Sequence, residues 1–308
     1  MYEKKFISVF LVLAILLSGC AAGRTDKPAI YNNTTEIVIA KDAVISYLGP
    51  AGTYTEEAAK LFFGEDSNTI PQTTVSDAVG QLLDGKCDYA VIPQENTIGG
   101  PVYDYIDVFL SHKELSVVGE VELPIRQALL VQDGTQLDNI KTVYSHKQGI
   151  AQGMEWLKNN LPEAEVVEVS STAEGAKMVS ESDLGDCAAI ASVGAAKVYG
   201  LSVFAENIQM NEDNKTRFYV LSTDAPQEEA CERMVFIACG EAADLALLLA
   251  KTEQCGLKPV YIHDRPEKTV LGRYIWLIEC EGGGRSDFEK ISSEVKFELQ
   301  YRGAFSVK

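Results

Sequence analysis

The sequence is short of positive charge, of histidine and of closely spaced cysteine. Lysine and arginine number 27 against 45 aspartate and glutamate residues, and the formal net charge is −18. Such acidity argues against nucleic acid or anionic lipid headgroups as partners, because both repel a negative surface. The 3 histidines and 7 cysteines show no C-x-x-C or other metal-ligand spacing, so we expect no metal site.

The sequence also lacks an apolar run of the ~20 residues that a membrane-spanning helix needs. An apolar run over residues 6–17 follows two lysines and leads into Ser18-Gly19-Cys20. A positive start, a short apolar stretch and a small-residue cleavage site indicate a signal peptide. The cysteine at its end resembles that of a bacterial lipoprotein signal.

We therefore expect a lipoprotein signal peptide over residues 1–19, lipidation at Cys20 and a tether over residues 20–42. The protein would then be extracytoplasmic and lipid-anchored to the cell membrane. A plain secretory signal with an incidental cysteine is the alternative. Disulfides form outside the cytoplasm, but the sequence assigns none to the remaining cysteines.

The composition, 46% hydrophobic and 23% charged, is that of ordinary globular domains. Strand and helix patterns alternate from Val44 to Leu221, which favours an α/β class. Strands are expected at 44–48, 90–92, 116–121, 128–131, 142–144, 166–169 and 188–191, and helices at 56–63, 75–83, 148–159 and 173–180. The stretch Gly85 to Ile92 resembles Gly185 to Ile190, and two related lobes would explain this internal echo.

Polar residues cluster beside three apolar strands, and the ends of strands are where open α/β sheets bind ligands. In the first segment, a strand enters the turn Gly49 to Gly52, and Thr53 and Thr55 follow at the start of a helix. The glycines allow close backbone approach to a ligand, and a helix N-terminus suits an anion. An ordinary strand-turn-helix with a threonine cap is the alternative.

In the second segment, a buried strand is expected to end at Pro93, and four polar residues follow, up to Thr97. The third segment, Asn214 to Phe218, stands just ahead of an apolar strand. Its Thr216 hydroxyl can donate a hydrogen bond to a departing oxygen, and its Arg217 guanidinium can hold a carboxylate. A plain entry into a surface strand is the alternative for this pair.

Together these segments resemble prephenate dehydratase. The matches keep the family's order and spacing from about residue 44 to about residue 222, and they include Gly49 to Tyr54, Pro93 to Thr97, Tyr144 to Gln148, Ser171 to Glu174 and Thr216 to Phe218. The sequence departs from the family at Gln94, where an apolar residue is usual, and at Lys147, where a proline is usual.

The resemblance implies a two-lobed α/β domain over residues 43–223, like a type II periplasmic binding protein. Lobe one would hold residues 43–123 and 209–223, lobe two residues 124–208, and the site would lie at their junction. The resemblance also implies a homodimer or homotetramer, and a reaction that needs no cofactor and no metal.

The implied reaction is the decarboxylating dehydration of prephenate to phenylpyruvate in phenylalanine biosynthesis. Thr216 is the expected catalytic residue, as the donor to the departing hydroxyl. Because prephenate is a dianion and the chain is acidic, we expect its carboxylates to meet local donors. The expected substrate-binding residues are Thr53, Thr55, Asn96, Thr97, Arg217 and Phe218, together with Glu95, which would fix the loop or Arg217. For Arg217, the alternative to a contact with a substrate carboxylate is that it holds the loop that orients Thr216.

After a polar linker, residues 232–308 show strands at 233–239, 258–262, 272–280 and 295–301 and helices at 242–253 and 287–293. This β-α-β-β-α-β order is ferredoxin-like. At the end of a prephenate dehydratase it resembles an ACT regulatory domain, which in this family binds phenylalanine. The matches to the family's effector motifs are Leu245, Arg265 and Pro266.

Other effector positions depart from the family. Ala243 and Asp244 replace Gly-Ala, and His263 and Asp264 replace Glu-Ser. Asp244 adds negative charge near an incoming carboxylate, and like charges disfavour one another. We therefore expect the phenylalanine response to be altered or lost. The alternative is that Asp264 and Arg265 compensate.

A binding protein is the competing functional class. A tethered two-lobed lipoprotein is usually a solute receptor for a transporter, and an ancestral dehydratase could keep a pocket for an aromatic carboxylate and lose turnover. Thr216 within an intact Asn-x-Thr-Arg-Phe favours the enzyme. A location outside the cytoplasm favours the receptor.

Substitution of the expected lipidation site tests the proposed anchor. Cys20→Ser should move the protein from the membrane fraction to the soluble fraction, because stable anchoring takes more than one acyl chain and the diacylglyceryl group of a lipoprotein resembles that two-chain case. Cell fractionation with immunoblotting measures this change. Recovery of the unsubstituted protein in the cytosol, with residues 1–19 still attached, would contradict the anchor.

Overall fold

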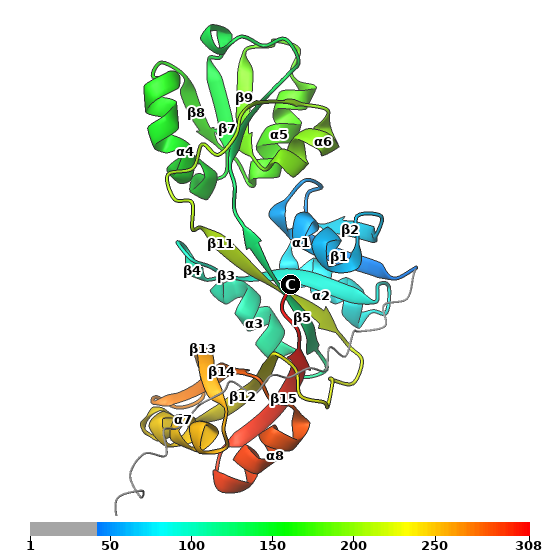
Figure 1. Ribbon diagram of the computed structural model, residues 1–308, viewed down its shortest axis with the longest axis vertical. Coiled ribbons are helices and arrows are strands. Elements are labelled where there is room, and N and C mark those ends of the chain that lie inside the picture. Colours follow the sequence, from blue (N-terminus) through cyan, green and yellow to red (C-terminus); the bar gives the residue numbers. More distant parts are fainter. Residues whose placement is uncertain (1–41) are drawn as a thin grey trace, which may run out of the picture. The chain divides into compact units, whose positions relative to one another are not determined.

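The computed structural model describes residues 42–308, so the expected signal peptide, Cys20 and the tether up to residue 41 lie outside the described residues. Residues 42–308 form three sheets (Figure 1). No helix in this range is long and apolar enough to cross a membrane. The six cysteines in this range are free thiols.

The first sheet has the strand order β2-β1-β3-β11-β5, with β4 beside β3. Strand β1 runs parallel to β2 and β3, whereas β11 lies antiparallel between β3 and β5. The elements of this lobe are β1 (Val44–Leu48), α1 (Tyr54–Phe63), β2 (Asn68–Gln72), α2 (Val75–Leu83), β3 (Tyr89–Asn96), β4 (Gly100–Pro101), α3 (Tyr103–Ser111), β5 (Ser116–Pro124) and β11 (Lys215–Ser222).

The second sheet has the strand order β10-β6-β9-β7-β8. The chain enters this lobe after β5 and leaves it before β11. Its elements are β6 (Ala128–Val131), the 3₁₀ helix η1 (Leu137–Asn139), β7 (Thr142–Ser145), α4 (Lys147–Asn160), β8 (Glu165–Glu168), α5 (Thr172–Glu181), β9 (Cys187–Ala191), α6 (Val193–Tyr199) and β10 (Ser202–Ala205).

The two lobes repeat one arrangement. The parallel strands β2-β1-β3 of the first lobe correspond to β8-β7-β9 of the second, and an antiparallel strand follows in each, β11 or β6. Gly85 and Gly185 precede the equivalent strands β3 and β9, and both have left-handed φ angles, of 68° and 64°. The internal echo in the sequence therefore marks the same turn in each lobe.

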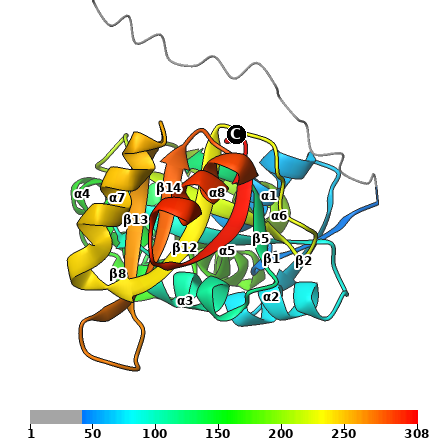
Figure 2. The same ribbon diagram turned by 90° about the horizontal axis from the view of Figure 1, so that it is seen from below.

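The third sheet is antiparallel, with the strand order β13-β14-β12-β15. Helices α7 and α8 pack on one of its faces, as the view from below shows (Figure 2). Its elements follow the expected β-α-β-β-α-β order and are β12 (Arg233–Glu241), the 3₁₀ helix η2 (Ala242–Asp244), α7 (Leu245–Gln254), β13 (Lys258–Pro266), β14 (Arg273–Glu281), α8 (Arg285–Glu294) and β15 (Glu298–Phe305).

The other face of the third sheet packs against the first sheet. One hydrophobic cluster contains Val235, Leu277 and Phe305 of the third sheet and Val117 and Tyr219 of the first. Burial of such apolar side chains stabilises the contact by roughly 1.5–3 kcal/mol for each large residue. The strand that carries Thr216 is therefore part of this interface.

A buried arginine also ties β15 to the C-terminal end of α3. Arg302 is 1% exposed and donates hydrogen bonds to the carbonyl oxygens of Phe109, His112 and Leu115 at 2.6–3.0 Å. Burial lowers its pKa to about 10. Because a helix end leaves carbonyl groups unpaired, Arg302 completes α3 from the third sheet.

Two of the strand boundaries that differ from the prediction affect the position of the site. Strand β3 passes through Pro93 and ends at Asn96, and β11 begins at Lys215, so Thr216 and Arg217 lie inside a strand rather than ahead of it. The sheet tolerates Pro93 because β1 pairs with β3 only up to Val91 and because β11 shifts its register opposite Pro93. Strand pairing therefore holds the second and third polar segments side by side.

Candidate active site

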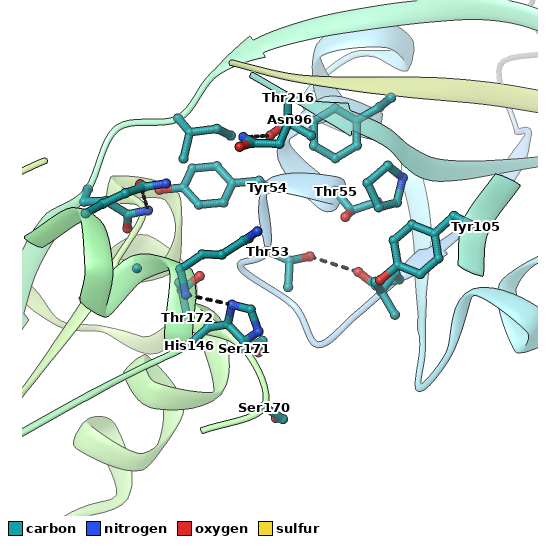
Figure 3. Close-up of a pocket in the computed structure, with 18 residues that line it drawn as sticks. Thr53, Tyr54, Thr55, Asn96, Tyr105, His146, Ser170, Ser171, Thr172 and Thr216 are labelled. Atoms are coloured by element: carbon teal, nitrogen blue, oxygen red, sulfur yellow. Dashed lines mark hydrogen bonds between the residues drawn. The ribbon is translucent and has the colours of Figure 1, made fainter. Parts of the chain in front are cut away.

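A pocket of about 220 Å³ lies between the two lobes. This volume is a little below the ~300–1,000 Å³ of typical ligand pockets, so the pocket suits a small molecule. Its polar side chains come from both lobes, β11 of the first lobe included (Figure 3). They are Thr53, Tyr54, Thr55, Asn96, Tyr105, Gln127, His146, Gln148, Gln152, Ser170, Ser171, Thr172 and Thr216.

No lysine, arginine, aspartate or glutamate is among the described residues that line this pocket. Three helices instead begin at it, because the N-cap residues Thr53 of α1, His146 of α4 and Ser171 of α5 all line it. The N-terminus of a helix carries free N–H groups and roughly half a positive charge. The pocket can therefore attract an anion without a fixed cation, although the chain is strongly acidic.

The caps decide which donors remain free. Thr53 Oγ1 accepts from the Glu56 N–H at 3.4 Å and donates to the Leu48 carbonyl at 3.1 Å, so this hydroxyl serves the turn rather than a ligand. His146 Nδ1 accepts from the Gln148 N–H at 3.4 Å. In a neutral His146 the hydrogen is then on Nε2, from which it can be donated to a ligand.

Asn96 orients the hydroxyl of Thr216. Its Oγ1 accepts a hydrogen bond from Asn96 Nδ2 at 2.9 Å. The amide orientation is fixed, because Asn96 Oδ1 accepts from the N–H groups of Ile98 and Gly99 at 3.0 and 2.8 Å. The hydroxyl hydrogen of Thr216 is therefore left for the pocket, and its oxygen faces a donor that stabilises negative charge.

Asn96 and Thr97 do not take the role expected from the sequence. Asn96 Nδ2 also donates to Asn214 Oδ1 and to the Lys215 carbonyl, at 2.8 and 3.0 Å. Thr97 lies outside the pocket lining, where its hydroxyl contacts Asn214 at 3.1 Å and accepts from the Lys215 N–H at 2.9 Å. Because their polar groups join β3 to β11, neither residue is free to hold a substrate carboxylate.

Arg217 faces away from the pocket, which disagrees with a contact to substrate and agrees with the alternative that Arg217 holds the segment of Thr216. Successive side chains of a strand point to opposite faces. Thr216 and Phe218 line the pocket, whereas Arg217 is 6% exposed and hydrogen-bonds to Glu120 and Glu279 at 2.6–2.9 Å. Glu95 is also off the pocket lining and lies 3.4 Å from Arg217, as a residue that fixes Arg217 would.

The glycine turn packs against the second lobe rather than against a ligand. Gly52 has a φ of +82°, and a Cβ there would lie 3.1 Å from the Ala195 Cα. The hydroxyl of Tyr199 donates to the Ala51 carbonyl at 2.7 Å. A Cβ at Gly49 would instead lie 2.6 Å from Pro71 Cβ in β2. The predicted opening of the backbone to a ligand is therefore replaced by a lobe-to-lobe contact at Gly52 and by packing within the first lobe at Gly49. In the same segment, Thr55 lines the pocket as expected.

The second lobe contributes donors to the site that were not expected from the sequence. These residues are Gln127, His146, Gln148, Gln152, Ser170 and Thr172. A polar N-cap directly after an apolar strand is the signal that draws attention to Thr53. The same signal occurs at His146 after β7 and shortly after β8 at Ser171. If this signal had been applied to both lobes, it would have identified most of the second lobe's residues in the pocket.

Known proteins resemble this chain in sequence. The prephenate dehydratase family profile matches residues 45–226. The chain belongs to the prephenate dehydratase family. A bifunctional chorismate mutase/prephenate dehydratase of Neisseria gonorrhoeae is 36% identical to it over 251 residues, which are 81% of this chain and 69% of that protein. The prephenate dehydratase of Bacillus subtilis is 31% identical over 252 residues, 77% of this chain and 88% of that protein.

A solved prephenate dehydratase has the same fold. The structure of the Arthrobacter aurescens enzyme in complex with L-Phe superposes with a TM-score of 0.76 at 29% identity, and it covers 85% of this chain and 90% of that chain. The prephenate dehydratase profile ends at residue 226, close to the end of β11, so all residues that line the pocket lie within it.

Proposed function

We propose that this protein converts prephenate to phenylpyruvate by decarboxylating dehydration, with Thr216 as the proton donor. One observation carries the assignment of Thr216. Its hydroxyl lines the interlobe pocket while its oxygen accepts a hydrogen bond from Asn96, which leaves its hydrogen for a substrate. The protein is thus a carbon–oxygen lyase of phenylalanine biosynthesis, as family membership supports.

The reaction defines what the site must supply. As the ring carboxylate leaves as CO2, its electron pair enters the ring, the C4–oxygen bond breaks, and the ring becomes aromatic. The hydroxyl leaves as water, so one proton is consumed. Aromatisation supplies the driving force, and the site has to orient the substrate and deliver the proton where negative charge develops.

Thr216 delivers this proton, and Asn96 stabilises the charge that Thr216 is left with. A threonine hydroxyl is a weak acid, so its hydrogen bond must strengthen as the C4–oxygen bond breaks. The Asn96 amide, 2.9 Å from Thr216 Oγ1, stabilises the negative charge that then grows on this oxygen. Solvent returns the proton to Thr216 after the products leave.

Helix N-termini and polar side chains hold the two carboxylates of the substrate. The N-termini of α1, α4 and α5 supply backbone N–H groups and partial positive charge. Thr55, His146 and Gln148 add side-chain donors within the pocket lining. No cofactor or metal takes part in this proposal, and residues 42–308 contain no group of three or more His, Cys, Asp or Glu side chains placed to hold a metal ion.

The C-terminal sheet is proposed to be an ACT-like domain, in a homodimer or homotetramer, with a weak phenylalanine response. Arg265, an expected effector residue, is engaged by Asp107 of α3 at 2.5 and 2.6 Å. Asp244 is exposed beside Leu245, another of the three expected effector residues. Burial lowers the pKa of His263, so its ring is neutral near pH 7. A phenylalanine carboxylate therefore meets one added negative charge and a guanidinium that is already paired.

The enzyme is further proposed to work outside the cytoplasm on a lipid anchor. The support is the Lys-Lys start, the apolar run over residues 6–17 and Cys20, all of which lie outside the described residues. The same location is what favours a receptor for an aromatic carboxylate. A purified protein that binds prephenate but forms no phenylpyruvate would support the receptor.

Removal of the Thr216 hydroxyl tests the proton donor. Thr216→Ala should lower kcat by ~10²-fold or more, the scale of a positioned proton donor, and leave KM little changed because the carboxylate donors remain. Phenylpyruvate formation from prephenate measures both constants. Thr223→Ala, at an exposed threonine just past β11, is the matched control. A Thr216→Ala enzyme with the parent kcat would overturn the mechanism.

A change of one functional group tests the role of Asn96. In Asn96→Asp, a carboxylate oxygen replaces the amide NH2 group that donates to Thr216. This oxygen accepts the hydrogen of the Thr216 hydroxyl, and the carboxylate adds negative charge beside the dianionic substrate. The expected fall in kcat is again ~10²-fold or more. Asn139→Asp, which adds the same charge at an exposed position of the second lobe, should behave like the parent. Equal kinetics for the two variants would show that Asn96 does not orient Thr216.

Phenylalanine titration tests the effector site. An intact site would couple binding to inhibition with ~1–3 kcal/mol. Because Asp244 adds charge and Arg265 is paired with Asp107, we expect little or no heat and little or no inhibition when phenylalanine is added to the full-length protein. Calorimetry and the turnover assay measure the two effects. Micromolar binding with matching inhibition would show that the effector site is intact.

A further inference from the structure

Arg217 is enclosed by carboxylates from both lobe one and the third sheet. Glu120 of β5 accepts from its Nε and Nη2 at 2.9 and 2.6 Å. Glu279 of β14 accepts from Nη2 at 2.8 and 2.7 Å, and Glu95 Oε2 lies 3.4 Å from Nη1. The ring of Tyr261, on β13, lies 3.5 Å from the guanidinium carbon. We call Arg217, Glu95, Glu120 and Glu279 the Arg217 cluster.

Glu279 belongs to the third sheet, but its partners lie on the catalytic strand. Its carboxylate is 0% exposed. Within residues 42–308, the hydrogen bonds that it accepts come from Arg217 and from the hydroxyl of Tyr219, both on β11. A buried carboxylate is costly unless it is paired and hydrogen-bonded. The side chain of Glu279 is thus satisfied by β11 and not by its own sheet.

Charge in the Arg217 cluster keeps the guanidinium in place. Burial alone would lower the pKa of Arg217, but the hydrogen bond to Glu120 and the charge of Glu279 raise it, so the side chain stays cationic. Burial raises the pKa of Glu120, the hydrogen bonds from Arg217 oppose this rise, and the charge of Glu279 adds to it. One cation therefore binds two fully buried carboxylates on opposite sides of the interface.

The C-terminal residues also hold β5, the strand beside β11. The Glu120 N–H donates to the Ser306 carbonyl at 3.2 Å, and the Lys308 N–H donates to the Glu120 carbonyl at 2.9 Å. Farther along β5, the Glu122 N–H donates to the Lys308 carbonyl at 2.9 Å. Both fully buried carboxylates of the Arg217 cluster are therefore held by the C-terminal part of the chain, Glu279 by β14 and Glu120 by this pairing.

We propose that Glu279 is a positioning residue of the dehydratase site, which fixes Thr216 on one face of β11 by holding Arg217 on the other. This inference rests on the proposed function of Thr216. Thr216 and Arg217 are consecutive residues, so a shift of β11 that releases the guanidinium also moves the Thr216 hydroxyl away from Asn96.

The test compares two glutamates of one strand. Glu279→Gln keeps the size of the side chain but turns an NH2 group toward the donors of Arg217 or Tyr219. We expect kcat to fall ~10- to 100-fold, as for a misplacement of about 1 Å, with KM within about twofold of the parent. Glu281→Gln, at an exposed residue of β14 that pairs with Lys258 at 3.2 Å, should keep the parent constants.

The same substitution in a Thr216→Ala enzyme separates a positioning role of Glu279 from an effect on general stability. If Glu279 acts through Thr216, then Glu279→Gln should cause no further loss in a Thr216→Ala enzyme. A folded Glu279→Gln enzyme with the parent kcat, or an equal fall in both backgrounds, would overturn the inference. A parent without turnover would contradict the proposed function instead. Should Glu279→Gln fail to fold, Tyr219→Phe removes one donor to Glu279 and should give a smaller fall in kcat, again absent in the Thr216→Ala background.

Discussion

The two-residue period of β11 is the constraint on which the rest of the structure depends. It sends Thr216 into the interlobe pocket and Arg217 into the interface with the third sheet. One strand therefore carries the reacting hydroxyl on one face and a cation held by Glu120 and Glu279 on the other. Because neighbouring residues of a strand cannot move independently, the chemistry of one face is linked to the packing of the other.

The pocket solves an electrostatic problem without fixed cations. A chain with a formal net charge of −18 repels a dianion at long range. The N-termini of α1, α4 and α5 meet this difficulty locally with N–H groups and partial positive charge. The guanidinium of Arg217, which could have bound a carboxylate, is instead used within the interface, where Glu120 and Glu279 keep it.

Local sequence patterns predicted most of the fold and one half of the site. The elements with clear periodicity, such as α2 at residues 75–83, lie where they were expected. Strand β2 was missed because it is an edge strand with an internal Pro71 and mostly exposed side chains. The sequence left the role of Arg217 open between a contact with substrate and a hold on the segment of Thr216, because β11 was expected to begin at Phe218. With its start at Lys215, the alternation would have put Arg217 opposite Thr216.

Contacts between distant residues could not be predicted from spacing. Glu279 is 62 residues from Arg217, and its charge is ordinary in the sequence of β14. Only the packing of the third sheet on the first shows that this carboxylate is fully buried and faces β11. The same holds for Asn96, whose amide faces Thr216 across 120 residues of sequence because β3 pairs with β11.

The central claim is that the hydroxyl of Thr216, held on β11, delivers the proton that lets the hydroxyl of prephenate leave. A comparison of Thr216→Ser with Thr216→Val, measured as phenylpyruvate formation under saturating prephenate, tests it most directly, because the first keeps the hydroxyl and the second replaces it with a methyl group. The account predicts that the serine enzyme retains kcat within about tenfold and that the valine enzyme loses ~10²-fold or more. Equal turnover by the two enzymes would contradict it.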